Sequence, residues 1–464
     1  MTANNNTVET NQTDQKFVDL VIRNGEILTP SGRQHGDIAC HEGTVVAIGE
    51  TGWRGRQEID ARGLTVLPGV MDTQVHFREP GLTHKETLEA GTRGAVLGGV
   101  TTIFEMPNTS PLTITREALA SKLEIAARDA WCDYGFYIGG CQANIHELAE
   151  LELLPGCVGI KVFMGSSFGD LLADQDDVLR EIVARGHRRM AIHAEDEARL
   201  RARRELVERS RTVTDHPHWR DVETALNATK RILAVSEAVQ RRLHLLHIST
   251  AEELELLASY RHRVSIEVLP HHLTLTAPEC YERLGTLAQM NPPIRGRRHQ
   301  DALWRAVRNG LVDVLGSDHA PHTLEEKAAP YPDSPSGMPG TQTLLPVMLD
   351  HVNAGRLSLE RLVDLTSAGP ARVFGIARKG RVAKGYDADF TLVDLKQRRE
   401  IERRWIASVS GWSPYEGMKV CGWPMMTVIR GQVVMRDDEV LGAPGGRPVQ
   451  FAETLRPQPE RSMI

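Results

Sequence analysis

Polar residues that can bind metals or move protons stand in this sequence at or just after short apolar runs. Imidazole nitrogens and carboxylate oxygens are ligands of zinc and similar divalent metals. A single histidine in such a place is commonly a hydrogen-bonded structural residue, whereas several such residues brought to one point favour a metal centre. The positions concerned are Gln74, His76, Lys161, His193, His247 and Asp318.

Lys161 differs from the rest of this set, because a protonated ammonium group has no lone pair and is repelled by a dication. One interpretation is an ordinary lysine that reaches the surface or forms a salt bridge, and the spacing alone favours it. The other is carbamylation of the amine by CO₂, which creates an anionic group able to bridge two metals. The residue types leave both interpretations open.

Eight apolar runs alternate with stretches of helical character, and the polar residues follow these runs. Such alternation is typical of parallel βα units, and eight units over roughly 250 residues predict a closed (β/α)₈ barrel. In such barrels the functional side chains project from the carboxyl ends of the strands. One predicted helix covers 111–130, with Thr113 or Thr115 as its cap. The predicted strands cover 70–76, 100–106, 132–140, 158–164, 190–194, 243–249, 264–270 and 312–318.

Both ends of the chain have a different sequence pattern from the central region, with short predicted strands separated by turns. Each end has too few strands for a stable sheet of its own. We therefore expect 17–67 and 378–450 to form one discontinuous β-sandwich domain, with the barrel over 68–377 between them. The polar segment 1–16 is expected to be a disordered tail. The expected terminal strands cover 20–28, 44–49, 58–67, 385–395 and 426–434.

Composition narrows the class of protein. Of the 464 residues, 41% are hydrophobic and 25% are charged, which is typical of a globular protein. A net charge of −6 argues against nucleic acid or a membrane surface as the partner and favours a small-molecule substrate. The six scattered cysteines form no CxxC pair, and the polar start lacks the features of a signal peptide. We expect a cytoplasmic protein with reduced thiols.

Several longer motifs together resemble those of the dihydroorotases of the amidohydrolase superfamily. The similarity runs from about residue 18 to residue 435, and its most specific block is LGSDHAPHTLEEK at 315–327. The other motifs are QVHFREPG at 74–81, HKETLEAGTRGAVLGGVTT at 84–102, EMPNT at 105–109, GIKVFMGSS at 159–167, IHAEDE at 192–197, HLLHISTAEE at 244–253, EVLPHHLTL at 267–275 and AQMNPPIR at 288–295.

This resemblance implies a zinc-dependent hydrolase that interconverts (S)-dihydroorotate and N-carbamoyl-L-aspartate in pyrimidine biosynthesis. His76 and Asp318 would bind one metal, His193 and His247 the second, and a carboxylated Lys161 would bridge them. A metal-bound hydroxide would attack the ring carbonyl, with Asp318 as the proton shuttle. The resemblance also implies a homo-oligomer.

The resemblance implies a substrate site next to the metals. Arg78 offers a planar fork suited to the substrate carboxylate, and Asn108 and Asn291 add amide groups. His322 would contact the ring, and Pro339 and Gly340 would contribute backbone groups. Of the other histidines, we expect His319 to orient the site from behind, and the motif pair His271 and His272 either to support the site or to have no role in it. We expect surface or loop positions for His84, His187, His216, His218 and His299.

Gln74 departs from the family pattern, which has histidine two residues before His76. A glutamine oxygen is a weak, neutral ligand, so we expect one tightly held zinc or two of unequal affinity. The loss allows another hypothesis, a catalytically silent dihydroorotase-like subunit that partners aspartate transcarbamoylase. The presence of the remaining site residues favours an enzyme. A related cyclic amidase, such as a dihydropyrimidinase, hydantoinase or allantoinase, is the third hypothesis, and Arg78 favours dihydroorotate over it.

Overall fold

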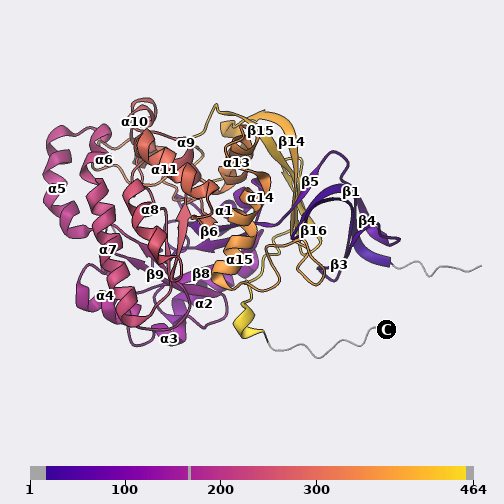
Figure 1. Ribbon diagram of the computed structural model, residues 1–464, viewed down its shortest axis with the longest axis horizontal. Coiled ribbons are helices and arrows are strands. Elements are labelled where there is room, and N and C mark those ends of the chain that lie inside the picture. The colour runs from indigo at the N-terminus through magenta and orange to yellow at the C-terminus, as the bar shows by residue number, and fades with distance from the viewer. Residues whose placement is uncertain (1–16, 166–168, 456–464) are drawn as a thin grey trace, which may run out of the picture.

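A barrel of eight parallel strands forms the larger part of the computed structural model, which describes residues 17–165 and 169–455 (Figure 1). Adjacent strands follow one another in chain order, and every predicted barrel strand is confirmed. The predicted tail at 1–16 lies outside the described residues. The strands are β6 (Val70–Val75), β7 (Val100–Glu105), β8 (Asp133–Gly139), β9 (Cys157–Phe163), β10 (Met190–His193), β11 (Leu243–Leu245), β12 (Val264–Val268) and β13 (Val314–Leu315).

The first and last barrel strands meet just beyond their ends. Val75 in β6 forms a parallel bridge with His319, which follows β13. The backbone N–H of His76 donates to the carbonyl of His319 at 2.7 Å. Because this contact lies at the carboxyl ends of both strands, it draws the segments that carry His76 and Asp318 together.

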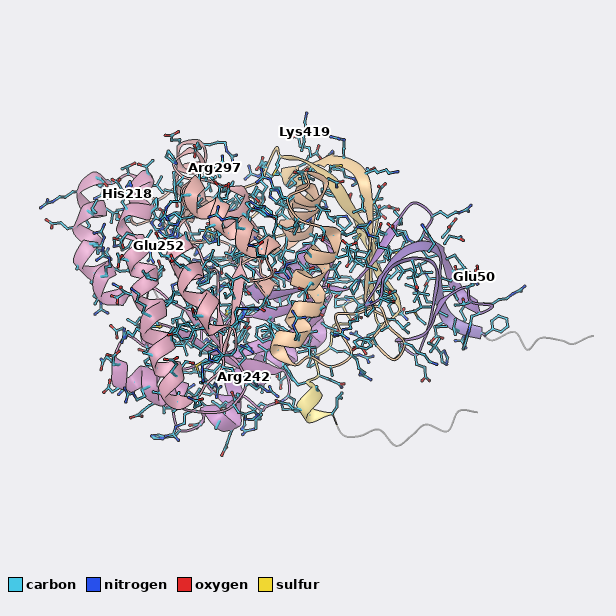
Figure 2. The ribbon with its side chains drawn as sticks, viewed as in Figure 1. Glu50, His218, Arg242, Glu252, Arg297 and Lys419 are labelled. Carbon is cyan, nitrogen blue, oxygen red and sulfur yellow. The ribbon has the colours of Figure 1, made fainter. Side chains whose placement is uncertain are left out.

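Helices surround the barrel, and Figure 2 shows side chains filling the space between them and the strands. The cap of α2 is Thr115 rather than Thr113, because the Thr115 hydroxyl accepts from the backbone N–H of Ala118. The α-helices are α1 (Leu88–Leu97), α2 (Arg116–Asp129), α3 (Leu148–Leu151), α4 (Asp176–Val183), α5 (Glu197–Ser210), α6 (His216–Trp219), α7 (Val222–Val239), α8 (Ala251–Leu257), α9 (Pro270–Thr274), α10 (Glu279–Leu284), α11 (Arg297–Arg308), α12 (Leu324–Lys327), α13 (Leu344–Asn353), α14 (Leu359–Val363) and α15 (Gly369–Phe374).

The two chain ends share a second sheet, as predicted. Figure 1 shows the N-terminal strands beside β14 and β15, and β14 pairs antiparallel with β5. Buried side chains from both ends form one core, among them Leu20, Val66 and Phe390. The boundaries proposed for this unit stay a prediction, and two strands, β2 and β17, were not predicted. The nine strands are β1 (Phe17–Thr29), β2 (Gly32–His41), β3 (Thr44–Gly49), β4 (Arg54–Asp60), β5 (Thr65–Pro68), β14 (Phe390–Glu400), β15 (Lys419–Ile429), β16 (Gln432–Arg436) and β17 (Glu439–Val440).

A buried charge network joins the second sheet to the barrel. The Lys379 ammonium lies 2.7 Å from an Asp133 oxygen at the start of β8 and also contacts Asp389, which precedes β14. Arg430, after β15, pairs with the other Asp133 oxygen. Burial opposes the charge of Lys379, but the surrounding carboxylates raise its pKa. In the part of the chain that is described, we find no helix with the length and apolar character needed to span a membrane.

Candidate active site

The predicted metal residues and three of the predicted substrate residues meet in one pocket at the carboxyl ends of the barrel strands. They come from β6, β9 and β10 and from the segments that follow β6, β7, β11, β12 and β13, although as much as 244 residues of sequence separate them. Phe163, Ala320, Ser336 and Gly337 complete the wall. The predicted residues in this lining are Gln74, His76, Arg78, Asn108, Lys161, His193, His247, Asn291 and Asp318.

His76 and Asp318 form the first pair of candidate ligands, with 3.2 Å between His76 Nε2 and Asp318 Oδ1. The Gln74 amide nitrogen donates to the same Asp318 oxygen at 2.9 Å, while its amide oxygen is buried without a hydrogen-bond partner. Gln74 thus directs an N–H group, not a ligand oxygen, towards the carboxylate. Asn108 Oδ1 lies 2.6 Å from His76 Nδ1, and with the proton on Nδ1 the Nε2 lone pair would be free for a metal.

His193 and His247 form the second pair, with 3.0 Å between His193 Nδ1 and His247 Nε2. Burial lowers the pKa of both histidines, so they are neutral and able to act as ligands. Glu195 lies 3.0 Å from His193 Nε2 and pairs with Arg220. Burial opposes the charge of Glu195, but Arg220 and His193 lower its pKa to about 2. This carboxylate therefore holds the Nε2 proton of His193 and frees Nδ1 for a metal.

Lys161 lies between His76 and His193 in sequence and lines the same pocket. Its side chain is 1% exposed, and its amine lies 4.4 Å from the centre of the Phe163 ring. It forms no salt bridge with a carboxylate among the described residues. Burial lowers its pKa to about 7, which makes the nucleophilic neutral amine available near neutral pH. These properties do not match a surface or salt-bridged lysine.

Backbone strain marks the same pocket. Arg78, His247 and Asp318 have φ values of 64°, 39° and 48°. Residues other than glycine rarely adopt this left-handed region, and where they do, the strain is often found at functional sites. Each of the three residues stands just beyond a barrel strand, where the chain turns sharply and presents the side chain to the pocket.

The predicted substrate residues divide into two groups. Arg78, Asn108 and Asn291 line the pocket, and His322 lies behind Arg78, with 3.3 Å between His322 Nε2 and Arg78 Nη2. Pro339 and Gly340 do not belong to this lining. They are buried in a small neighbouring cavity, where the Gly340 N–H donates to His319 Nδ1 at 3.1 Å. They support the segment after β13 from behind, because the chain has already turned away from the pocket.

One of the surface predictions was wrong. His216 is 0% exposed, and its Nε2 lies 2.9 Å from the Met290 carbonyl and 3.1 Å from Asn291 Oδ1. The short helix α6 begins at this histidine, and the contact with Asn291 places the ring against the pocket wall. Two residues on, His218 is 70% exposed, as predicted. His216 and Glu195 were missed; Glu195 had one sequence signal, its place two residues after His193.

The donor set fits a divalent metal under one condition. The four neutral or anionic ligands form two pairs, and within 17–165 and 169–455 no three His, Cys, Asp or Glu side chains are arranged so that they could hold a metal ion by themselves. Lys161 lines the same pocket as both pairs, but a protonated ammonium group cannot be a metal ligand. Carboxylation of the amine would supply an anion able to complete the donor set.

The first comparison concerns the class of protein. Residues 65–434 match the model of the amidohydrolase family, and this region covers the whole barrel and the strands β5, β14 and β15 of the second sheet. Among solved structures, L-hydantoinase (dihydropyrimidinase) from Arthrobacter aurescens superposes with a TM-score of 0.89 and 32% identity, covering 93% of this chain and 99% of that one. A dihydropyrimidinase from Brevibacillus agri gives a TM-score of 0.86 and 29% identity, covering 94% and 99%. The chain belongs to the amidohydrolase family, and its fold is that of the family's solved structures.

The second comparison narrows the family. Dihydroorotase of Halobacterium salinarum is 38% identical over 419 residues, which are 89% of this chain and 96% of that protein. Dihydroorotase of Pyrococcus abyssi is 36% identical over 434 residues, with 93% and 97% covered. The chain belongs to the dihydroorotases of the amidohydrolase family.

Proposed function

We propose that this protein catalyses the reversible hydrolysis of (S)-dihydroorotate to N-carbamoyl-L-aspartate. The observation that carries this proposal is the state of Arg78. Its guanidinium is 2% exposed, lines the pocket and forms no ion pair with a carboxylate among the described residues. Burial lowers the pKa of Arg78 to about 10, yet the group stays charged at neutral pH. A buried cation without a counter-ion at a pocket wall favours a substrate that carries a carboxylate.

Zinc, one or two ions per chain, is the cofactor we propose. His76 and Asp318 would hold one ion, His193 and His247 the other, and N6-carboxylated Lys161 would link them. Such an ion supplies an activated water and polarises the ring carbonyl. Because Gln74 donates to Asp318 instead of offering its oxygen, we propose that the first site is the weaker one.

Side chains of the pocket would orient the substrate and transfer the proton. Arg78 would orient the ring through its carboxylate, and Asn291 would add polar contacts at the pocket wall. Asp318 would accept the proton of the attacking water and return it to the ring nitrogen as the carbon–nitrogen bond breaks. The N–H of Gln74 lies 2.9 Å from the Asp318 carboxylate and would keep that group in place.

The first test replaces Arg78 with methionine. We expect Arg78→Met to raise KM for dihydroorotate at least about tenfold and to change KM for hydantoin little, because only the first ring carries a carboxylate. Steady-state assays of zinc-loaded protein with both substrates measure this. Arg242→Met, which removes an exposed arginine away from the pocket, is the control. An equal loss for both substrates would contradict the role given to Arg78.

The likeness to solved hydantoinases favours a second candidate, a cyclic amidase for an uncharged ring. Turnover of hydantoin or dihydrouracil by the wild type, without turnover of dihydroorotate, would establish it instead. A folded, zinc-loaded protein with no turnover of any of these rings would favour the silent subunit that partners aspartate transcarbamoylase. Homo-oligomer formation and a cytoplasmic location belong to the main proposal, and the six free cysteines fit a reducing compartment.

A further inference from the structure

One wall of the pocket is a short loop held from outside by two side chains that do not line the pocket. Ser336 and Gly337 belong to the lining, and Asn291 faces them from another segment. The loop spans 334–337, and Lys327 and Gln289 connect it to the segment before Asn291. We call Lys327 and Gln289 the clasp.

Lys327 ends the short helix α12 and is 0% exposed. Its amine donates to the carbonyl oxygens of Gln289 at 3.0 Å, Pro335 at 2.8 Å and Gly337 at 3.1 Å. These three acceptors use all three N–H bonds of an ammonium group. Lys327 forms no salt bridge with a carboxylate in the described parts of the chain. A buried lysine is usually paired with an acid. Here backbone carbonyls of two segments hold the amine, and burial lowers its pKa to about 7.

Gln289 holds the same loop with both ends of its side-chain amide. Its nitrogen donates to the Ser334 carbonyl at 2.8 Å and to the Ser336 hydroxyl at 3.1 Å, and its oxygen accepts from the Ser334 hydroxyl. The Gln289 carbonyl accepts from the Gly337 N–H at 2.9 Å and also from Lys327. The clasp therefore bonds to both serine hydroxyls of the loop and to the carbonyl oxygens of Ser334, Pro335 and Gly337.

The loop has little room to move without changing the pocket. Gly337 has a φ of 143°, and a Cβ atom there would lie 2.3 Å from the Ala320 carbonyl oxygen. Ala320 also lines the pocket, two residues after Asp318. The Ser336 carbonyl lies 3.1 Å from His322 Nε2, the nitrogen that also contacts Arg78. A shift of the loop would thus reach both the ring-facing wall and the guanidinium.

We propose that Lys327 and Gln289 are positioning residues that set the fit of the substrate ring by holding the 334–337 loop. This inference rests on the proposed function. Within the described parts of the chain, neither residue hydrogen-bonds to a candidate metal ligand or to Asp318, so their loss should weaken substrate binding and leave the bond-breaking step largely intact. In kinetic terms KM should rise and kcat should stay close to that of the wild type.

The test combines kinetics with hydrogen exchange on zinc-loaded, full-length protein. For Lys327→Met we expect KM for dihydroorotate to rise at least about tenfold, with kcat within about threefold of wild type. We expect amide exchange to rise in peptides that cover 334–338 and to stay unchanged in the barrel strands. Lys384→Met, at an exposed lysine of the second unit, is the control and should change neither quantity.

The outcomes separate the clasp from general stability and from the proposed function. Unchanged exchange at 334–338, a uniform rise across the whole chain, or a fall in kcat at constant KM would each overturn the clasp. If Lys327→Met does not fold, the Gln289→Ala variant tests the clasp by itself. Its steady-state kinetics and its amide exchange at 334–338 are then compared with those of the wild type. If the wild type does not hydrolyse dihydroorotate, the proposed function fails, while the exchange comparison still decides whether the clasp holds the loop.

Discussion

At the scale of single residues, the pocket is defined by which atom of each side chain faces which neighbour. His76 and His193 each have one ring nitrogen next to a partner oxygen, from Asn108 and Glu195 respectively, and the other nitrogen next to a second candidate ligand. A metal ligand must direct an oxygen lone pair at the ion. Gln74 instead directs its amide N–H at Asp318, and its amide oxygen has no hydrogen-bond partner. The difference between the two candidate metal sites therefore resides in one side chain.

Replacing Gln74 with histidine tests this difference. We expect Gln74→His to raise the affinity of the weaker site for zinc at least about tenfold, because imidazole is a stronger ligand for zinc than an amide oxygen. Elemental analysis after graded dialysis against a chelator measures the zinc retained per chain. The exposed Gln432→His serves as the control. Two equally chelator-resistant zinc ions in the wild type would contradict the assignment.

At the scale of elements, the helices outside the barrel depend on buried polar contacts with the segments that form its mouth. His351 in α13 is 5% exposed, lies 2.9 Å from the Thr274 hydroxyl in α9, and packs edge-on against Trp304 in α11. Burial, and to a lesser degree Arg356, lowers the pKa of His351 to about 4. The contact among these three helices therefore requires the neutral imidazole.

This requirement predicts acid sensitivity. The unfolded chain binds a proton at His351 below about pH 6.5, whereas the folded protein resists protonation until about pH 4. The stability from neutral His351 is thus full above pH 6.5 and is lost as the pH falls towards 4. Between pH 7 and pH 5, we expect the free energy of unfolding to fall by roughly 2 kcal/mol less in His351→Gln than in the wild type.

Chemical denaturation at the two pH values measures the difference. His218→Gln, which changes an exposed histidine at the edge of the molecule in Figure 2, should behave as the wild type. An equal loss of stability in His351→Gln and wild type would show that His351 titrates normally in the folded state.

At the scale of the whole molecule, Lys379 links the barrel to the sheet built from both chain ends. It is 6% exposed and lies among Asp133 of the barrel and Asp387 and Asp389 of the second unit. Removing the cation would leave buried carboxylates without their partner, which typically costs about 3–5 kcal/mol. The two units should therefore lose stability together.

We expect Lys379→Met to lower the temperature of a single shared unfolding transition in differential scanning calorimetry. The exposed Lys384→Met, a few residues away, should leave that temperature unchanged. Separate transitions for the two units in the wild type, or an unchanged temperature in Lys379→Met, would contradict a network that couples them.

The sequence by itself determined the eight barrel strands, the joining of the two chain ends and the members of the pocket from Gln74 to Asp318. These depend on local hydrophobic patterns and on motifs at strand ends. A residue at the carboxyl end of a barrel strand lies at the mouth of the barrel, where the functional side chains gather. The family followed from the same motifs.

Only the tertiary structure decided which side chains support the pocket and which merely lie near it in sequence. Pro339 and Gly340 stand behind His319, buried His216 contacts the wall, and Lys327 holds a loop from outside. Such contacts join segments far apart in the chain or reverse the direction of a loop. Their side-chain partners are set by how the barrel closes and the loops pack, which no local pattern records.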